Sequence, residues 1–242
     1  MKYIKLENLP TNIVAFTTTK ELGNTAYQVS DNKDEVKKIR EQIAKDFNFK
    51  MNDFIFTYQY HSTTICKVNE THKGLGAFSF ESGVRADALY TKDYNTPIGV
   101  FHADCVPVFI YAPSIPLVGI IHAGKPGSIN EITFKSLLAL ITNEGIDPRD
   151  IHLHIGPSLR QEKEIVNEEE IHYLKMHGYD NCLKDNKLDK ALLNVEQALR
   201  VGVLKENITV SDADTYDNEL TYSANNQEKE VGRMASIIYL KS

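Results

Sequence analysis

The chain has 242 residues, of which 42% are hydrophobic and 25% charged, values typical of a soluble globular protein. This length allows one large domain or two small ones, and because no change in composition marks a boundary, we expect one domain. Its formal net charge of −6 at pH 7, with no basic stripe interleaved with aromatic residues, weighs against nucleic acid as a partner. The N-terminus lacks the apolar segment of a secretory signal, and no run reaches the roughly 20 apolar residues that span a bilayer, so we expect a cytoplasmic protein with a small diffusible substrate and no membrane contact.

The first half of the chain predicts strands around one amphipathic helix. Residues 14–19 are typical of an opening strand, and residues 33–47 repeat apolar side chains close to helical spacing, which predicts a helix packed on a sheet. Residues 54–68 are rich in aromatic and β-branched side chains, so two strands with a break near His61 are expected there. Residues 86–91 predict a further strand.

The middle of the chain predicts two buried strands followed by a helix. Residues 106–111 and 117–121 are short apolar runs separated by a proline-containing turn, which indicates neighbouring strands with a tight connection. Residues 128–131 fit the S-x-x-E capping box, so the next helix is expected to begin at Ser128. Its N-terminus would lie near His122 and could hold an anion there.

The remaining segments continue to alternate helices and strands. The patterns predict a strand over 150–155, a helix from Asn167, a loop over 181–189, a helix ended by Gly202, and closing strands over 207–211 and 233–240. The chain contains neither GxGxxG nor GxxxxGK[ST], so a nucleotide cofactor bound through those motifs is not expected.

Three residues distant in the sequence form a candidate metal site. Cys105 precedes the first of the two buried strands, and His122 follows the second, so adjacent strands would bring a thiol and an imidazole together. His61 supplies a second imidazole. This ligand set suits zinc, with copper as the less favoured metal, and three protein ligands leave a position for water or substrate. Asp104 and His102 are expected to orient the ligands.

The same residues also fit a metal-free nucleophilic site. Cys105 with His122 or His61 as its base would form a cysteine hydrolase or deamidase, and the spacing does not separate this reading from a metal site. The three cysteines are an odd number without CxxC spacing, so free thiols rather than disulfides are expected. Cys66 and Cys182 are assigned no role.

An ordered set of short motifs along the chain resembles the YfiH/YlmD family of bacterial purine nucleoside phosphorylases, formerly described as multicopper polyphenol oxidoreductases or laccase-domain proteins. The similarity extends over almost the whole chain and lies in residues 59–61, 86–89, 103–108, 122–124, 155–157 and 232–235.

The resemblance implies a fold, a metal and an activity. It implies one α+β domain over residues 1–242, with mixed β-sheet packed by helices and similar to a bacterial deamidase-toxin catalytic fold. It implies that His61, Cys105 and His122 bind the catalytic Zn²⁺. The implied reaction is phosphorolysis of adenosine, inosine, guanosine or methylthioadenosine, with nucleoside and phosphate as substrates and adenosine deamination as a second activity.

Several cationic positions of the family are replaced in this chain. Lys125 and Pro126 stand where the family has Trp-Arg, Thr19 stands at an arginine position, and Asn225 and Asn226 replace an Arg-Arg pair. Phosphate is held best by bidentate arginine, so these replacements leave open a family member that binds metal or nucleoside without turnover. The candidate substrate-binding residues are Asn24, Arg85, Lys125 and Asn225, and Lys20 and Arg160 are further cations that could compensate.

Overall fold

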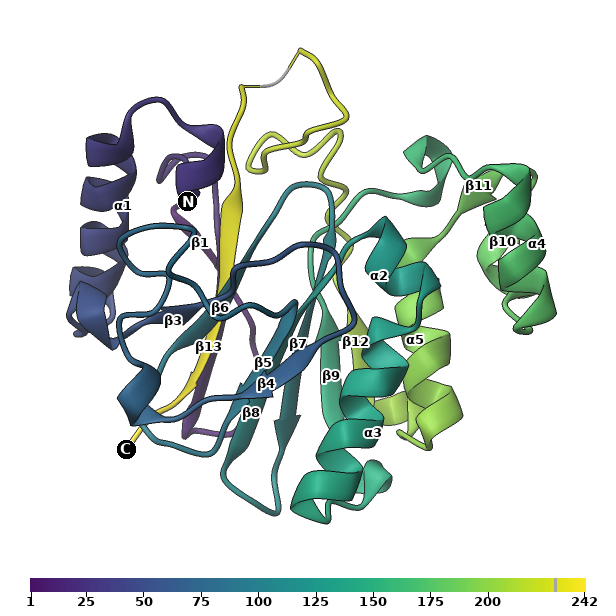
Figure 1. Ribbon diagram of the computed structural model, residues 1–242, viewed down its shortest axis with the longest axis horizontal. Coiled ribbons are helices and arrows are strands. Elements are labelled where there is room, and N and C mark those ends of the chain that lie inside the picture. Colours follow the sequence, from purple (N-terminus) through teal and green to yellow (C-terminus); the bar gives the residue numbers. More distant parts are fainter. Residues whose placement is uncertain (229) are drawn as a thin grey trace.

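Two β-sheets pack face to face, and helices cover their outer faces (Figure 1). The computed structural model describes residues 1–228 and 230–242. The first sheet has the strand order β1-β2-β13-β6-β3, the second has the order β12-β9-β7-β8-β5-β4, and β10 and β11 form a small separate hairpin. Both large sheets mix parallel and antiparallel pairs, which confirms the predicted α+β domain of mixed sheet packed by helices.

The elements have the following bounds. The strands are β1 Tyr3–Lys5, β2 Ile13–Thr18, β3 Ile55–Phe56, β4 Ile65–Lys67, β5 Ala88–Thr91, β6 Ile98–His102, β7 Val106–Ala112, β8 Leu117–Ala123, β9 His152–Ile155, β10 Leu183–Lys184, β11 Lys187–Leu188, β12 Ile208–Val210 and β13 Met234–Leu240. The α-helices are α1 Lys33–Asp46, α2 Lys125–Ile129, α3 Ile132–Glu144, α4 Glu168–Met176 and α5 Lys190–Val201. No helix of the described chain is long and apolar enough to cross a membrane.

Side-chain alternation along the central strands builds the layers. On β13, Ile238 and Leu240 point between the sheets, whereas Ile237 and Tyr239 point toward α1. On β7, Phe109 lies between the sheets and its neighbours face α3 and α5. Both faces of these strands are therefore buried, which explains why they appear in the sequence as continuous apolar runs.

The structure places most predicted elements within a few residues of their expected bounds. Helix α1 begins after Asn32, whose side chain accepts a hydrogen bond from the backbone N–H of Glu35 at 3.2 Å. Helix α4 has the predicted cap, in which the Asn167 side chain accepts from the backbone N–H of Glu170 and the Glu170 carboxylate accepts from that of Asn167. Strand β1 was not predicted, because its three residues carry too short a pattern.

Two local predictions were wrong. The helix expected to begin at Ser128 is broken in two, because Glu131 has a left-handed backbone with φ of 64° that separates α2 from α3. The Ser128 hydroxyl donates to the carbonyl oxygen of Ala123 at 3.2 Å instead of capping a helix. The expected loop over 181–189 contains the β10-β11 hairpin, in which Leu183 pairs with Leu188. So short a hairpin is held by tertiary contacts: the leucines pack against neighbouring residues, and the Leu188 N–H donates to the carbonyl oxygen of Glu164 at 2.9 Å.

A buried arginine attaches α1 to the loops beside it. The Arg40 guanidinium donates to the carbonyl oxygens of Thr25 at 2.7 Å, Gly76 at 2.6 Å and Ala77 at 2.9 Å. It also lies over the rings of three aromatic residues, Tyr27, Phe56 and Phe101, at 4.3–4.9 Å. Burial lowers the pKa of Arg40 to about 9. One side chain therefore fixes two loops and a strand at the same point.

Replacing this guanidinium should destabilise the fold. In Arg40→Met, three carbonyl oxygens lose a charged donor, so the free energy of unfolding should fall by about 3 kcal/mol. Urea denaturation would measure this change. Lys38→Met, at an exposed position of the same helix, is the control and should stay close to wild type. A change in Arg40→Met no larger than in the control would show that the three hydrogen bonds contribute nothing net.

Candidate metal centre

Strand pairing brings Cys105 and His122 together. Strands β7 and β8 are antiparallel neighbours, and Pro107 is opposite His122 in their register. Cys105 immediately precedes β7, and His122 is the penultimate residue of β8, so both side chains lie at the same end of the pair. The convergence predicted from the two apolar runs is confirmed.

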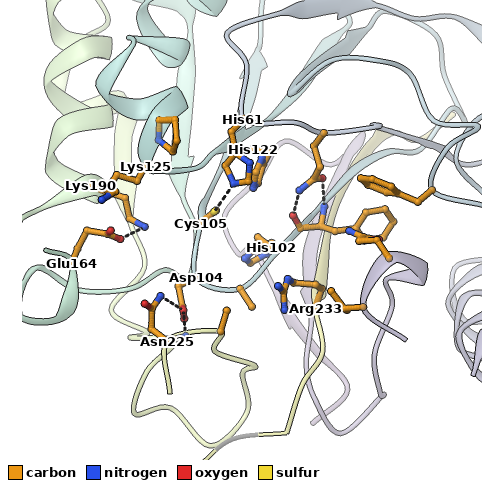
Figure 2. A pocket seen from close by; sticks show the side chains of 18 residues that line it. His61, His102, Asp104, Cys105, His122, Lys125, Glu164, Lys190, Asn225 and Arg233 are labelled. Atoms are coloured by element: carbon orange, nitrogen blue, oxygen red, sulfur yellow. Dashed lines mark hydrogen bonds and ion pairs between the residues drawn. The ribbon is translucent and has the colours of Figure 1, made fainter. Parts of the chain in front are cut away.

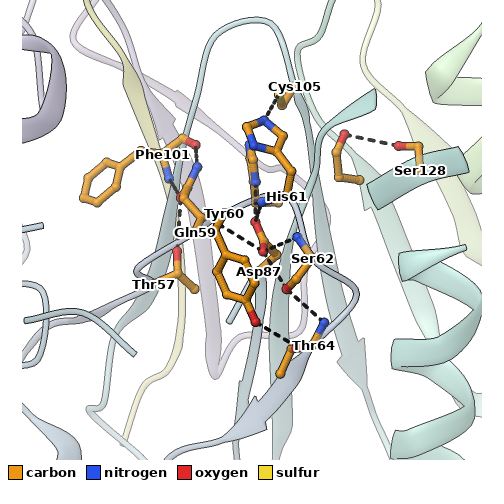
Figure 3. A network of polar contacts seen from close by, with 12 residues as sticks. Thr57, Gln59, Tyr60, His61, Ser62, Thr64, Asp87, Phe101, Cys105 and Ser128 are labelled. Atoms are coloured by element: carbon orange, nitrogen blue, oxygen red, sulfur yellow. Dashed lines mark hydrogen bonds and ion pairs between the residues drawn. The ribbon is translucent and has the colours of Figure 1, made fainter. Parts of the chain in front are cut away.

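His61 reaches the same place from the loop between β3 and β4. Its backbone has φ of 61°, an unusual conformation for a residue with a side chain, and the Asp87 carboxylate stabilises it (Figure 3). The carboxylate accepts hydrogen bonds from the backbone N–H groups of Tyr60 at 3.2 Å, His61 at 3.1 Å and Ser62 at 2.7 Å. The hydroxyl of Ser62 donates to it as well, at 2.7 Å.

The same carboxylate orients the second imidazole. Nδ1 of His122 lies 2.9 Å from Oδ1 of Asp87, and both side chains are buried. With Nδ1 engaged, Nε2 is the ligand atom that His122 offers to the site. Asp87 was not singled out in the sequence, although it lies in the 86–89 motif at the start of β5. The signal available in the sequence was an acidic residue between two alanines in an otherwise apolar segment.

The two residues expected to orient the ligands have other partners. Asp104 accepts from the Thr215 hydroxyl at 2.6 Å and from the Asn225 side-chain amide at 2.7 Å. Nε2 of His102 lies 2.8 Å from the Ser236 hydroxyl, and burial lowers the pKa of His102 to about 3. Asp104 therefore holds the segment after β12 against the site, and His102 is a neutral side chain bonded to β13.

The charges around Cys105 favour its thiolate. Burial acts to raise the pKa of this thiol, but His122, His61 and Lys190 outweigh burial and lower it well below its usual range. Burial acts to lower the pKa of His122, yet the Cys105 thiolate and Asp87 raise it to about 9. The thiolate is the form that binds metals and attacks carbon centres.

The other two thiols lack this environment. Burial raises the pKa of Cys66, and burial together with nearby carboxylates raises the pKa of Cys182 to about 12. All three cysteines are free, as expected from their number and spacing.

The donor atoms of His61, Cys105 and His122 fit a single metal ion. They all lie within 4.8 Å of one another, and Sγ of Cys105 is 3.9 Å from Nε2 of His61. Two such ligands of one tetrahedral zinc ion would be roughly 3.6 Å apart. Gly124 keeps the space open, because a Cβ there would lie 2.4 Å from Cδ2 of His61 and 3.2 Å from Sγ of Cys105. This group could therefore hold a metal ion.

The candidate centre faces a cavity of about 400 Å³ (Figure 2). Besides the three ligand candidates, residues that line it include Gln59, Phe80, Phe101, His102, Asp104, Lys125, Glu164, Lys190, Asn225 and Arg233. In Figure 2 the Glu164–Lys190 pair and Arg233 lie on different sides of the ligand candidates. The volume and the mixed aromatic and charged lining suit a small polar ligand with a flat ring.

The cations of the cavity differ in whether they are paired. Lys190 forms an ion pair with Glu164, and Lys125 lies 3.4 Å from Glu170. Arg233 donates through Nη1 to the carbonyl oxygen of Gly232 at 2.8 Å, and over residues 1–228 and 230–242 no carboxylate pairs with it. Burial acts to lower the pKa of Arg233, and the charges of Cys105 and Asp104 act to raise it. The sequence motif at 232–235 contains Arg233, but its role was not predicted.

The predicted substrate-binding residues occupy different places. Lys125 and Asn225 line the cavity, although the Lys125 ammonium already donates to the carbonyl oxygen of Ile165 at 3.1 Å. Asn24 is outside the described lining of the cavity and holds Arg233, accepting from its backbone N–H at 2.9 Å. Arg85 is exposed and lies over the ring of Tyr60 at 5.2 Å.

The replaced family positions have local roles. The Thr19 hydroxyl donates to the carbonyl oxygen of Met1 at 2.5 Å, and Pro126 occupies the first turn of α2. The Asn226 side chain donates to the carbonyl oxygen of Tyr216 at 2.9 Å.

Comparisons with known proteins show the family and the fold. The family described as multi-copper polyphenol oxidoreductase laccase matches residues 17–241. Purine nucleoside phosphorylase YlmD of Bacillus subtilis (strain 168) is 31% identical over 247 residues, covering 95% of this chain and 89% of the relative.

Two solved structures have the same fold. The crystal structure of YlmD from Geobacillus stearothermophilus superposes with a TM-score of 0.93 at 28% identity, covering 100% of this chain and 97% of that one. The hypothetical protein YfiH of Bacillus licheniformis gives the same TM-score and identity, with coverage of 99% and 97%. The chain therefore belongs to the YfiH/YlmD family, and the match to the family extends over residues 17–241.

Proposed function

We propose that this protein is a zinc-dependent purine nucleoside phosphorylase that acts on adenosine, inosine, guanosine or methylthioadenosine. The observation that carries the proposal is the convergence of His61, Cys105 and His122 on a cavity that also contains an arginine with no carboxylate partner among residues 1–228 and 230–242. The relatives named as purine nucleoside phosphorylases, at about 30% identity over nearly the whole chain, support the same reaction.

The donor set favours zinc over copper. One thiolate and two imidazoles are ligands that zinc accepts in a tetrahedral site, and three of them leave one position open. Bound zinc would supply a Lewis acid that stabilises negative charge developing on the substrate. Asp87 contributes by holding both histidines: its carboxylate contacts Nδ1 of His122 and accepts a hydrogen bond from the backbone N–H of His61. Adenosine deamination to inosine, as a second activity, would use the same centre.

Arg233 is the residue best suited to hold phosphate. A planar guanidinium binds a phosphate oxyanion through two parallel hydrogen bonds, and this one forms no ion pair with a carboxylate among the described residues. In the reaction, a phosphate oxygen forms a bond to C1′ of the ribose while the bond from C1′ to N9 breaks. The base takes that bonding pair and the proton of hydrogen phosphate, so nucleoside and HPO4²⁻ give free base and the dianion of ribose 1-phosphate.

A second candidate function rests on two of these residues, Cys105 and His122, together with Asp87. The Cys105 thiolate beside His122, with Asp87 on the far nitrogen of that ring, is also the arrangement of a nucleophile, a base and an orienting carboxylate. A metal-free cysteine hydrolase or deamidase would use it. Metal content distinguishes this function from the first.

Metal content and turnover should depend on the same side chains. Purified protein should hold about one zinc ion per chain and release free base from inosine only when phosphate is present. Cys105→Ala and His122→Ala should lose both properties, whereas Cys66→Ala, which removes a thiol outside the site, should keep both. Metal analysis and chromatography of the products measure these outcomes.

Three results would count against this proposal. Metal-free protein alkylated selectively at Cys105 would favour the cysteine hydrolase. Zinc or nucleoside binding without any release of base would identify a family member that binds without turnover. The absence of free base, ribose 1-phosphate and inosine at high enzyme concentration would exclude both proposed activities.

Removing the negative charge of Asp87 should lower the zinc affinity of the centre, although Asp87 is not itself a ligand candidate. In Asp87→Asn the amide cannot accept all the hydrogen bonds that the carboxylate takes from the His61 loop and from His122, so zinc affinity should fall about 10- to 100-fold. Competition with a chelator measures the affinity. Asp150→Asn, which alters a carboxylate bound to Ser114 away from the cavity, is the control. Equal affinities in the two variants would contradict the role assigned to Asp87.

A methyl group at Gly124 should displace a ligand. The added Cβ of Gly124→Ala would lie 2.4 Å from His61, so we expect zinc stoichiometry and turnover to fall together while the fold remains. Gly119→Ala in the same strand region is the control, since its nearest new contact is 3.3 Å from the Leu89 carbonyl oxygen. Full zinc binding by Gly124→Ala would show that His61 is not a ligand.

A further inference from the structure

The buried ion pair between Lys190 and Glu164 is an unexpected feature of the cavity. Their side chains are only 3% and 11% exposed, and both residues line the cavity. Lys190 is the first residue of α5, where the positive end of the helix dipole disfavours a cation. A buried pair of this kind is usually no more stabilising than apolar residues of the same volume. Its position beside the candidate metal centre points to recognition of a ligand.

Both members of the pair retain hydrogen-bonding capacity. An ammonium has three donors, and across the described chain the ion-pair partner of Lys190 is Glu164 alone. Glu164 uses Oε2 for this contact, which leaves lone pairs on Oε1. Hydrogen bonds also hold the backbone at both residues, since Asp189 caps α5 by accepting from the backbone N–H of Leu192 and the Leu188 N–H donates to the Glu164 carbonyl oxygen. The ion pair therefore presents a donor beside an acceptor.

Two sides of the cavity differ in how their cations are paired. Arg233 precedes β13 in the first sheet, whereas Lys190 lies on α5, which covers the outer face of the second sheet. Among the described residues Arg233 forms no ion pair with a carboxylate, whereas Lys190 is paired with Glu164. A phosphate dianion placed next to Glu164 would be repelled, whereas a neutral heterocycle would not be.

We infer that the Glu164–Lys190 pair binds the purine base and that Arg233 binds phosphate on the opposite side of the ribose. This assignment rests on the proposed phosphorolysis. Displacement of N9 by a phosphate oxygen requires the entering and leaving groups to lie on opposite faces of C1′, and the two walls supply such an arrangement around the candidate metal centre (Figure 2). A purine edge offers an N–H or amino donor next to a ring nitrogen or carbonyl acceptor, which complements Glu164 and Lys190 respectively.

Steady-state kinetics should separate the two walls. Glu164→Gln and Lys190→Met should raise KM for inosine about 10- to 100-fold and leave KM for phosphate within about twofold, and Arg233→Met should do the reverse. Lys92→Met, which removes a lysine from an ion pair with Glu144 outside the cavity, should change neither constant. Equal changes of both constants in the Glu164 and Lys190 variants would overturn the assignment.

A charge exchange distinguishes recognition from a structural role. The double variant Glu164→Lys/Lys190→Glu keeps an ion pair but exchanges the donor and the acceptor. If the pair only stabilised the fold, this variant would recover the wild-type KM for inosine, and such recovery would overturn the inference. If the pair forms hydrogen bonds with the base, KM for inosine should stay raised. Where the exchanged pair does not fold, Glu164→Gln alone still decides the question, because it preserves the shape of the side chain.

Binding of the free base tests the inference without turnover. Titration calorimetry with hypoxanthine or adenine should show binding to the wild-type protein that weakens about tenfold in Glu164→Gln and stays unchanged in Arg233→Met. Absence of phosphorolysis with intact base binding would defeat the proposed function alone. Phosphorolysis with equal base affinity in wild type and Glu164→Gln would contradict only the assignment of base binding to the Glu164–Lys190 pair.

Discussion

The site depends on one buried carboxylate that serves two imidazoles. Asp87 accepts three backbone N–H groups from the loop that carries His61 and also contacts Nδ1 of His122. Without these acceptors, the left-handed backbone at His61 would have no local support and the His122 ring could rotate. The Cys105 thiolate and the Asp87 carboxylate together raise the pKa of His122, so Asp87 contributes to both the geometry and the electrostatics of the centre.

The cavity around this centre is lined by several charged side chains, although burying a charge costs free energy. Lys190, Glu164, Asp104 and Arg233 all line it. Lys190 begins the capped helix α5, the Thr215 hydroxyl holds the Asp104 carboxylate, and the Asn24 side chain holds the backbone of Arg233. Such an arrangement reduces stability relative to an apolar cavity and instead pre-organises donors and acceptors. The chain therefore retains polar groups around its candidate centre although several family arginines are replaced.

Elements that are determined by local sequence patterns were predicted correctly. The apolar period over 33–47 predicted α1, and the Asn167–Glu170 capping box predicted the start of α4. The prediction at Ser128 failed because Glu131 has a left-handed backbone, which separates the short helix α2 from the longer helix α3. The functional groups that sequence reasoning missed, including Asp87 and the Glu164–Lys190 pair, lie in ordinary local contexts and become distinctive only through their spatial partners.

By itself, the sequence determined the alternation of strands and helices, the convergence of Cys105 with His122 and the family, because each follows from local periodicity or from ordered motifs. Tertiary structure alone decided that two sheets stack face to face, that Asp87 rather than Asp104 orients the ligands, and which cations remain unpaired. The physical reason is that hydrogen bonds and ion pairs act over a few ångströms, and the groups they join here are separated by 26 to 35 residues of chain.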